Sequence, residues 1–291
     1  MRLVKPSFSI MAMSGHNELP YQYENPLPLI EAAGRTCYKT EDKISPGTAE
    51  AFVKMIEANG HLSVMEHSWE TRSYPYNQRI IEGLMGMESL LSKSIVGNSL
   101  VLSGNIRMFV DAQILLSPYK YNPFSLFPGT PKHRAATVRI VCDRGVSHEL
   151  VRHRLASYSQ ESTRYCNYSK KGDGHVSFII PSWSNIKEGL YIRSHSQYIG
   201  GIATEAWVNN CFESERNYEE LLSIGWTPQQ ARSVLPNSLK TEIVVTTNWE
   251  QWQHIFNMRS IGIAGKPHPQ MLEIMQPLHA KFKEMEPEVF K

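Results

Sequence analysis

The chain has 291 residues, with 30 Lys and Arg against 28 Asp and Glu, so its formal net charge is only +2. This length is enough for one large domain or two small ones with a substantial hydrophobic core. Hydrophobic residues make up 41% and charged residues 20%, values that are ordinary for a soluble globular protein. A general nucleic-acid binder usually carries a larger basic excess. Any anion-binding site must therefore be a local cluster of arginines.

The cysteines and the apolar stretches indicate the compartment. The cysteines are scattered, without a CxxC pair: Cys37, Cys142, Cys166 and Cys211. This argues against a disulfide framework and against a zinc site, and it favours reduced thiols. The first residues lack a long apolar run, and no stretch approaches the roughly 20 apolar residues that span a bilayer. We expect a soluble, cytoplasmic protein without a bound metal.

The first helix is predicted to begin at Ser45-Pro46, where a capping residue precedes a proline. Phe52, Met55 and Ile56 would then fall on one face, and Asn59-Gly60 would end the helix.

Strands and helices mix without a steady βαβ alternation along the rest of the chain, which favours an α+β fold with a mixed sheet flanked by helices. No linker divides the sequence, so we expect a single domain over residues 1–291. The further predicted strands lie at 68–74, 136–142, 176–180 and 243–247. The further predicted helices lie near 77–92 and 105–115, from 143 to about 154, and over 187–223 with an interruption at Gly200-Gly201, and two more are capped by Thr227 before Pro228 and by Asn248. A loop is predicted at 122–131.

Residues 152–165 form the most informative segment. Three arginines and a histidine lie within fourteen positions, interleaved with hydroxyls and with Tyr158 and Tyr165. Arginine binds phosphate or a pyrimidine carbonyl edge with two parallel hydrogen bonds, and serine and threonine hydroxyls can complete a phosphate site. The same composition would also suit a solvated basic turn, or a nucleic-acid module that uses the tyrosines for stacking.

Three further segments carry candidate residues, although each one alone is compatible with a structural role. Residues 231–236 contain Arg232 before an apolar run, and residues 248–259 read as an amphipathic helix with a polar edge. His61 and His67 are six positions apart, which is poor spacing for a metal pair on one helix.

Together these segments resemble the flavin-dependent thymidylate synthases. Their signature is Arg-His-Arg, seven residues and then Ser, and here it reads Arg152-His153-Arg154 to Ser162. The resemblance extends to residues 35–38, 61–67, 231–236 and 248–259, in the family's order and over most of the chain. Agreement of several segments is far more specific than the single motif.

The resemblance implies roles for individual residues. The dUMP ligands would be Glu149, Arg152, Gln160, Ser162, Thr163, Arg164, Arg232 and Arg259, with Arg232 reaching the nucleotide from a neighbouring subunit. The FAD contacts would be Cys37, Ser63, Arg152, His153, Arg154, Asn248, His254, Met258 and Arg259. His61 would lie where folate stacks on the flavin. Arg152, Arg259 and Ser162 would be the catalytic residues, with Ser162 acting as a dUMP ligand rather than as a nucleophile.

The resemblance also implies the reaction. The enzyme would methylate dUMP to dTMP with 5,10-methylenetetrahydrofolate as carbon donor and with FAD, reduced by NADPH, as hydride source. Arginine donors would stabilise the negative charge on the uracil, and no enzyme cysteine would act as nucleophile. The protein would be a homotetramer with active sites shared between subunits, and it would bind neither nucleic acid nor a membrane.

The sequence also departs from the family pattern. Glu149 stands where other members can carry Gln, Gln160 stands where some carry Glu, and a helical or loop insert at about 75–130 is longer than a minimal member needs. The spacing from Arg259 to His268 is extended, so His268 is not assigned to the flavin site. Another uracil modification on the same fold, such as hydroxymethylation, remains an alternative, whereas an inactive paralogue is disfavoured because the motif residues are present.

Overall fold

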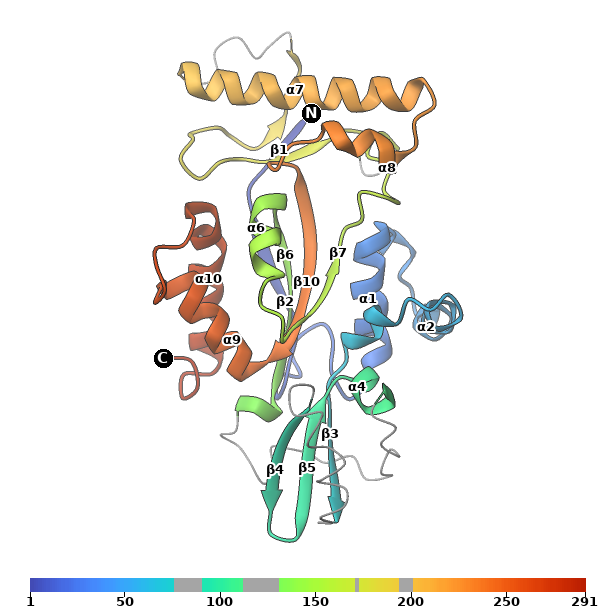
Figure 1. Cartoon of the computed structure of the whole chain (residues 1–291), viewed down its shortest axis with the longest axis vertical. Helices are drawn as coiled ribbons and strands as arrows, with labels where there is room; N and C mark the ends of the chain where they lie inside the picture. Colours follow the sequence, from blue (N-terminus) through green and yellow to red (C-terminus); the bar gives the residue numbers. More distant parts are fainter. Residues whose placement is uncertain (76–90, 112–130, 171–172, 194–200) are drawn as a thin grey trace.

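The computed structural model describes residues 1–75, 91–111, 131–170, 173–193 and 201–291. Three β-sheets follow one another along the long axis of the molecule (Figure 1). A small sheet lies beneath helix α7 at one end, a four-stranded sheet occupies the middle, and a three-stranded sheet forms the other end. The predicted α+β class, with sheets flanked by helices, is confirmed.

The central sheet is antiparallel, with the order β2-β6-β10-β7. Its strands are β2 (Ser7–Met13), β6 (Ala135–Asp143), β7 (Ser157–Gln160) and β10 (Lys240–Asn248). Strands β6 and β10 pair along their whole length, from Lys240 opposite Asp143 to Asn248 opposite Ala135. Both are rich in β-branched residues, which suit a pleated, buried surface. The predicted strands at 136–142 and 243–247 are therefore confirmed.

One face of the central sheet packs against α6 (Arg144–Leu150), α9 (Trp249–Phe256) and α10 (Pro269–Met285). The other face packs against α1 (Pro26–Tyr38), which in turn packs against α2 (Thr48–Ala58). Gly34 permits this second contact, because a Cβ there would lie only 2.6–2.8 Å from Phe52 and Val64. The predicted cap at Asn248 is confirmed, since its side chain accepts a hydrogen bond from the backbone N–H of Gln251 at 2.8 Å.

The end of the molecule near the N-terminus is built on a mixed sheet. Strand β1 (Arg2–Val4) pairs in parallel with β8 (Ser177–Ile179) and antiparallel with β9 (Gly189–Leu190). The long helix α7 (Ile202–Ser223) and the short helix α8 (Pro228–Ala231) lie over it (Figure 1). The predicted capping box at Thr227 is confirmed, with Gln230 as its partner.

The opposite end holds the antiparallel sheet β3-β5-β4, made of β3 (Glu70–Pro75), β4 (Ser92–Val96) and β5 (Ser99–Gly104). It is followed by α4 (Ile106–Asp111). The strand expected at 68–74 is confirmed as β3. Short 3-10 turns occur at Glu41–Lys43 (η1), Leu62–Glu66 (η2), Pro131–His133 (η3) and Arg232–Val234 (η5), and one π-helical turn, η6, covers Asn257–Ile261.

Several element predictions were wrong in detail. The first helix is α1, and α2 begins at Thr48 rather than at Ser45-Pro46, with Met55 44% exposed rather than on the buried face. The helix after Asp143 ends at Leu150, where the Tyr158 hydroxyl lies 2.8 Å from the carbonyl oxygens of both Leu150 and His153 and shares its one proton between them.

The stretch at 187–193 is not helical, because Gly189–Leu190 completes the edge of the β1 sheet. The expected helix near 77–92 and the loop at 122–131 fall almost entirely outside the described residues, as does most of the insert at 75–130. None of the helices in the described part of the chain is both long and apolar enough to cross a membrane.

Candidate active site

Arg259 connects two elements that are far apart in sequence. It lies on the π-helical turn η6, and its side chain is only 18% exposed. Its guanidinium donates to the Glu149 carboxylate at 2.6 Å, to the Glu149 carbonyl oxygen at 3.2 Å and to Nε2 of His153 at 3.1 Å. A π-turn re-aims the side chains that follow a helix and is frequent at functional sites. We call Glu149, His153 and Arg259 the arginine cluster.

His153 is neutral in this cluster. Burial lowers its pKa to about 4, and the nearby charges of Arg259, His254 and Arg152 contribute in the same direction. Nε2 therefore keeps its lone pair and accepts from Arg259. The His254 ring meets the His153 ring edge-on, with 5.6 Å between centroids. The structure thus brings together His153, His254 and Arg259, three of the residues expected to contact the flavin.

Residues 162–166 form a second group, which we call the 162–166 loop. The backbone N–H of Ser162 donates to the Cys37 carbonyl at 3.0 Å, and that of Cys166 donates to the Ser162 carbonyl at 2.9 Å. The Arg164 side chain is exposed and lies over the Tyr165 ring. The loop is thus bound to the C-terminal end of α1, with Arg164 exposed, Ser162 partly buried and Thr163 buried.

Arg232 lies beside this loop. It begins the turn η5 and donates to the Thr163 hydroxyl at 2.9 Å. In this chain Arg232 contacts the loop of its own chain. Its expected contact with a neighbouring subunit's nucleotide stays a prediction. Gln160, at the end of β7, donates to the hydroxyls of Ser147 at 2.8 Å and Thr241 at 3.2 Å.

A cavity of about 670 Å³ lies between the central sheet and the β3-β5-β4 sheet. Arg154 and Asn248, both expected flavin contacts, line it. So do cationic side chains that no sequence motif had indicated, namely Lys93, Arg107 and Lys132, together with the ring of Trp69. Glu66 and Glu250 also line the cavity, and Glu66 pairs with Arg107 at 2.7 Å. The volume is in the range of small-molecule and cofactor sites.

His61 lies next to the 162–166 loop. The Tyr38 hydroxyl is 2.6 Å from Nδ1 of His61, and the Tyr38 ring lies near both the His61 ring and the Tyr165 ring. Ser63 is exposed on η2, close in sequence to this group. His61 and Cys37 therefore lie on the α1 side of the molecule with Ser162, whereas Arg259 and His153 lie on the α6 and α9 side.

The remaining candidates have simpler surroundings. Arg152 is exposed, and Met258 lies on η6 beside Arg259. His268 caps α10, where Nδ1 accepts from the Gln270 backbone N–H at 3.3 Å, and its ring meets that of Trp183. In the described part of the chain, no group of three His, Cys, Asp or Glu side chains could hold a metal ion.

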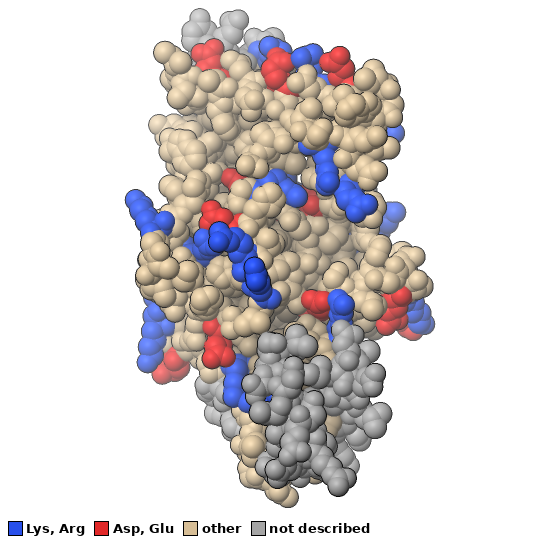
Figure 2. All heavy atoms as spheres, in the orientation of Figure 1, with Lys and Arg blue, Asp and Glu red and all other residues tan. Residues whose placement is uncertain are grey.

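Lysine and arginine side chains are concentrated across the middle of the face in Figure 2, at the level of the central sheet. A near-neutral net charge is therefore compatible with a local concentration of basic side chains on this face.

Comparisons with known proteins agree with the motif. The sequence profile of the family described as thymidylate synthase complementing protein matches residues 128–288, which is more than half of the chain. The chain belongs to this family. The matched region contains the whole arginine cluster, the 162–166 loop and Arg232, so the resemblance drawn from the motif residues is confirmed.

Relatives within the family carry the name flavin-dependent thymidylate synthase. One from Thermococcus onnurineus is 34% identical over 119 residues, which is 41% of this chain and 43% of that protein. One from Corynebacterium efficiens is 27% identical over 239 residues, 80% of this chain and 66% of that protein. The chain thus spans less than half the length of the first of these relatives.

Among solved structures, the UMP/dUMP methylase PolB from Streptomyces cacaoi bound with 5-Br dUMP is similar to this chain. The TM-score is 0.48 at 15% identity, covering 100% of this chain and 95% of that protein.

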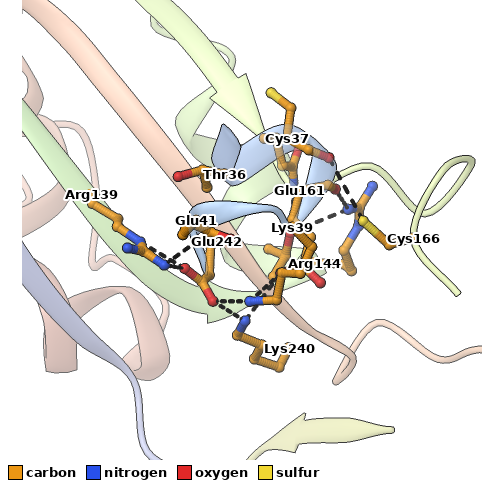
Figure 3. Close-up of polar contacts among 12 residues, drawn as sticks. Thr36, Cys37, Lys39, Glu41, Arg139, Arg144, Glu161, Cys166, Lys240 and Glu242 are labelled. Carbon is orange, nitrogen blue, oxygen red and sulfur yellow. Dashed lines mark hydrogen bonds and ion pairs between the residues drawn. The ribbon is translucent and has the colours of Figure 1, made fainter. Parts of the chain in front are cut away.

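Several charged residues that surround the family's motif in the structure were not predicted from the sequence. Figure 3 shows Lys39, Arg139, Glu161, Lys240 and Glu242 converging on the α1 side of the central sheet. Lys240 and Glu242 point to the same face of β10, but the strand was predicted only from residue 243, so this alternation was not visible in the sequence. No signal marked Lys39 or Glu161 either.

Proposed function

We propose that this chain is a flavin-dependent thymidylate synthase that methylates dUMP to dTMP. The carbon comes from 5,10-methylenetetrahydrofolate, and the hydride comes from FAD that NADPH has reduced. The observation that carries the proposal is the convergence of Arg259, Glu149 and His153 inside the region that matches the family. Arg259 and Glu149 are 110 positions apart in the sequence, and the Arg259 guanidinium joins them by donating to the Glu149 carboxylate.

The arginines have an electrostatic task in this reaction. Uracil C5 must become nucleophilic, so negative charge develops toward the ring carbonyl oxygens. A guanidinium fixed beside those oxygens stabilises that charge without reorganising. Arg259 is suited to this role because Glu149 and His153 hold it in place, and Arg152 follows directly on α6's C-terminal turn. Neutral His153 accepts from Arg259 and so adds no competing positive charge.

The nucleotide's phosphate would bind at the 162–166 loop. Ser162, Thr163 and Arg164 supply hydroxyls and a guanidinium, and Arg232 adds a second guanidinium beside Thr163. Paired arginines bind phosphate more specifically than lysines do, because each presents a planar fork. Gln160 and Glu149 would face the uracil edge.

The flavin dinucleotide would bind in the cavity. Its cationic lining suits a pyrophosphate and Trp69 offers a ring for an aromatic base, and both features lie around Arg154 and Asn248. His153, His254, Met258 and Arg259 of one chain would hold the flavin ring on one side, and Cys37 and Ser63 of a neighbouring chain would hold it on the other, with folate at His61. When bound, FAD supplies the hydride that completes the methyl group. The protein's residues bind, orient and polarise.

The cysteines support a mechanism without an enzyme thiolate. Cys142, Cys166 and Cys211 are completely buried. Burial raises the pKa of Cys37 and Cys142, and it raises that of Cys211 to about 12. A thiol in such surroundings is a poor nucleophile at neutral pH.

The proposed assembly is a homotetramer of single-domain chains. Large apolar side chains are exposed over the α7 end of the molecule, including Ile202 at 90%, Trp183 at 67% and Ile224 at 68%. Exposed apolar surface of this kind is typical of contacts between subunits. The two separated groups of expected flavin residues would then be completed by neighbouring chains.

The test is an anaerobic reduction of the purified, FAD-loaded protein by NADPH, with and without dUMP, followed by product analysis with methylenetetrahydrofolate. We expect flavin bleaching that accelerates with dUMP, and we expect dTMP as the product. Hydroxymethyl-dUMP would identify a different uracil modification. A protein that takes up no FAD but binds nucleic acid with steep salt dependence would contradict the proposal.

Arg152→Ala sharpens this test. Turnover of dUMP should fall about 100- to 1000-fold, the usual loss when one charge-stabilising donor is removed, and flavin retention should weaken. The matched control is Arg216→Ala, which removes an exposed arginine of α7 that pairs with Glu213 and Glu220. Normal turnover and a normal flavin spectrum in Arg152→Ala would refute its assigned role.

A further inference from the structure

Six charged side chains form a network on the α1 face of the central sheet, outside the residues assigned to dUMP, flavin and folate. They are Lys39, Glu41, Arg139, Glu161, Lys240 and Glu242, joined by ion pairs (Figure 3). We call them the ion network. Three cationic groups face three carboxylates, so the network is neutral as a whole. Charges that are taken out of water require such compensation.

Glu161 connects the ion network to the 162–166 loop. Its side chain is 0% exposed, and its carboxylate lies 3.1 Å from Nζ of Lys240 and 3.6 Å from Nζ of Lys39. Its backbone N–H donates to the Glu242 carbonyl at 2.8 Å. The next residue, Ser162, donates its N–H to the Cys37 carbonyl. Glu161 is therefore fixed by its carboxylate and its backbone, and Ser162, the first residue of the loop, is fixed by its backbone.

Lys39 holds the other side of this connection. It ends α1 with φ +53°, and it is the only non-glycine residue with positive φ among those the structure describes. A left-handed residue after a helix is usually glycine or asparagine. Here a lysine adopts this conformation, and its ammonium reaches both Glu242 and Glu161. The backbone turn thus places the ammonium between two buried carboxylates and directs the end of α1, with the Cys37 carbonyl, toward the loop.

Glu242 is the centre of the ion network. It pairs with Lys39, Lys240 and Arg139, and Arg139 also reaches Glu41 at 3.2 Å. These three cations hold the pKa of Glu242 well below its usual range despite burial. Glu41, on η1, is part of the same charge balance but has no contact with the loop among the interactions of the described residues.

We propose that Glu161 is a positioning residue, which acts with Lys39 and Lys240 to hold the 162–166 loop in the shape that receives the nucleotide's phosphate. Ser162, Thr163 and Arg164 would touch the nucleotide, and Glu161 would act only through them. The kinetic part of this inference rests on the proposed function. The loop-ordering part does not, because it concerns hydrogen bonds within the chain.

The experiment compares Glu161→Gln with Glu41→Gln in the full chain. Both variants remove one carboxylate from the ion network, but only the first touches the loop. Hydrogen exchange of peptides covering residues 158–168 should accelerate at least about tenfold in Glu161→Gln and remain at the wild-type rate in Glu41→Gln, because local opening sets the exchange rate. Equal protection in both variants would overturn the proposal.

Steady-state kinetics supply the second readout. In Glu161→Gln the KM for dUMP should rise about tenfold while kcat stays within about twofold, the pattern of lost binding that is equal in ground and transition states. If the wild-type enzyme neither binds nor turns over dUMP, the proposed function fails, and the exchange comparison still decides whether Glu161 orders the loop.

Two variants separate positioning from general stability. Adding Lys240→Met to Glu161→Gln restores the charge balance, so the melting temperature should recover while the KM for dUMP remains high. Lys39→Gly suits the left-handed backbone and so should fold, but it loses the ammonium. It should also raise the KM for dUMP and the exchange of 158–168. A wild-type KM and wild-type exchange in Lys39→Gly would contradict the proposal even if Glu161→Gln failed to fold.

Discussion

One face of the central sheet packs against α9 and α10, the other packs against α1, and the two contacts are built from different chemistry. On the first face the rings of Trp252, Phe256, Phe282 and Phe290 lie 5.0–5.9 Å apart in successive pairs. The indole N–H groups there donate to strand carbonyls, as Trp252 does to Ala136 at 3.0 Å. This face is an aromatic core with its few polar atoms paired.

The α1 face carries a chain of buried polar groups. The Tyr23 hydroxyl contacts that of Thr137 at 2.8 Å, Thr137 contacts Thr246 at 2.7 Å, and Thr246 contacts Nδ1 of His67 at 2.8 Å. Farther along the same strands lie Arg139 and Glu242. Side chains on a strand alternate between faces, so β6 and β10 present mainly apolar groups to α9, whereas toward α1 they present these polar groups beside the buried Ala135 and Val244.

The two faces therefore should contribute differently, one to the stability of the fold and the other to the position of α1 and the loop. Apolar burial is roughly proportional to area and does not fix direction, whereas hydrogen bonds and ion pairs require one geometry. The aromatic face should therefore supply most of the free energy of folding. The polar face should determine where the end of α1 and the 162–166 loop lie. The variants that follow test this division, beginning with the largest expected effect.

Trp252→Ala should break the aromatic face. Trp252 is fully buried and contacts Phe256 and Phe282, so its truncation should lower the free energy of unfolding by about 4 kcal/mol. Chemical denaturation of the purified protein measures this. The control is Ile95→Ala on β4, in which a truncation to alanine at a 59% exposed position away from the α7 end should change stability by less than about 0.5 kcal/mol. Equal losses in both variants would show that the aromatic face does not dominate.

Glu242→Gln tests the polar face. Removing this buried charge leaves Lys39, Lys240 and Arg139 with less compensation, which should lower the free energy of unfolding by about 3 kcal/mol at pH 7. Glu50→Gln is the matched control, because its pair with Lys54 is exposed and should contribute nothing measurable. A neutral result for Glu242→Gln would mean that the ion network is dispensable.

Glu242→Gln should also change how the free energy of unfolding depends on pH. The folded pKa of Glu242 lies below its unfolded value near 4.3, so its stabilisation is complete above that value and is lost as the pH falls toward the folded pKa. Buried His67, with a pKa of about 3, and His153, at about 4, instead destabilise from about pH 6.5 downward, because the unfolded chain binds their protons first. The free energy of unfolding should be measured between pH 7 and 3 in the wild type and in Glu242→Gln. Above pH 5 it should change with pH by the same amount in both proteins. Below that pH the slope should be shallower in Glu242→Gln.

The sequence predicted the elements whose signals are local. The β-branched runs of β6 and β10 and the caps at Thr227 and Asn248 depend on neighbouring residues, and all of them are confirmed. Helix α1 was missed because it combines two prolines near its start with Gly34, and its stability depends on packing against Phe52 and the sheet. Strand β9 depends on pairing with β1, almost 190 positions earlier, which no local pattern reveals.

The candidate site divides in the same way. The resemblance named Arg152, His153, Arg154 and Arg259, but it did not indicate that Arg259 would lie on Glu149 and His153. The ion network was not predicted, because its members lie at the end of α1, on η1, on β6, just after β7 and on β10, and they meet only after folding. The positive φ of Lys39 has no sequence signal, since lysine rarely takes that conformation.

The smallest expected effect is the coupling between Thr137 and Tyr23, which distinguishes a directed hydrogen bond on the polar face from simple burial. Thr137→Val keeps the shape and volume of the side chain but leaves the buried Tyr23 hydroxyl without its partner. Tyr23→Phe is the second single variant, which removes the Tyr23 hydroxyl itself, and the double variant lacks both hydroxyls. Each single variant should destabilise the protein, and the double variant should lose about 1 kcal/mol less than the sum of the two, because neighbouring groups in one hydrogen-bond chain are coupled. Urea denaturation of the four proteins measures that coupling. Strict additivity would mean that burial alone, rather than the directed hydrogen bond, holds Tyr23 and the segment before α1 against the sheet. The polar face would then stabilise the fold in the same way as the aromatic one.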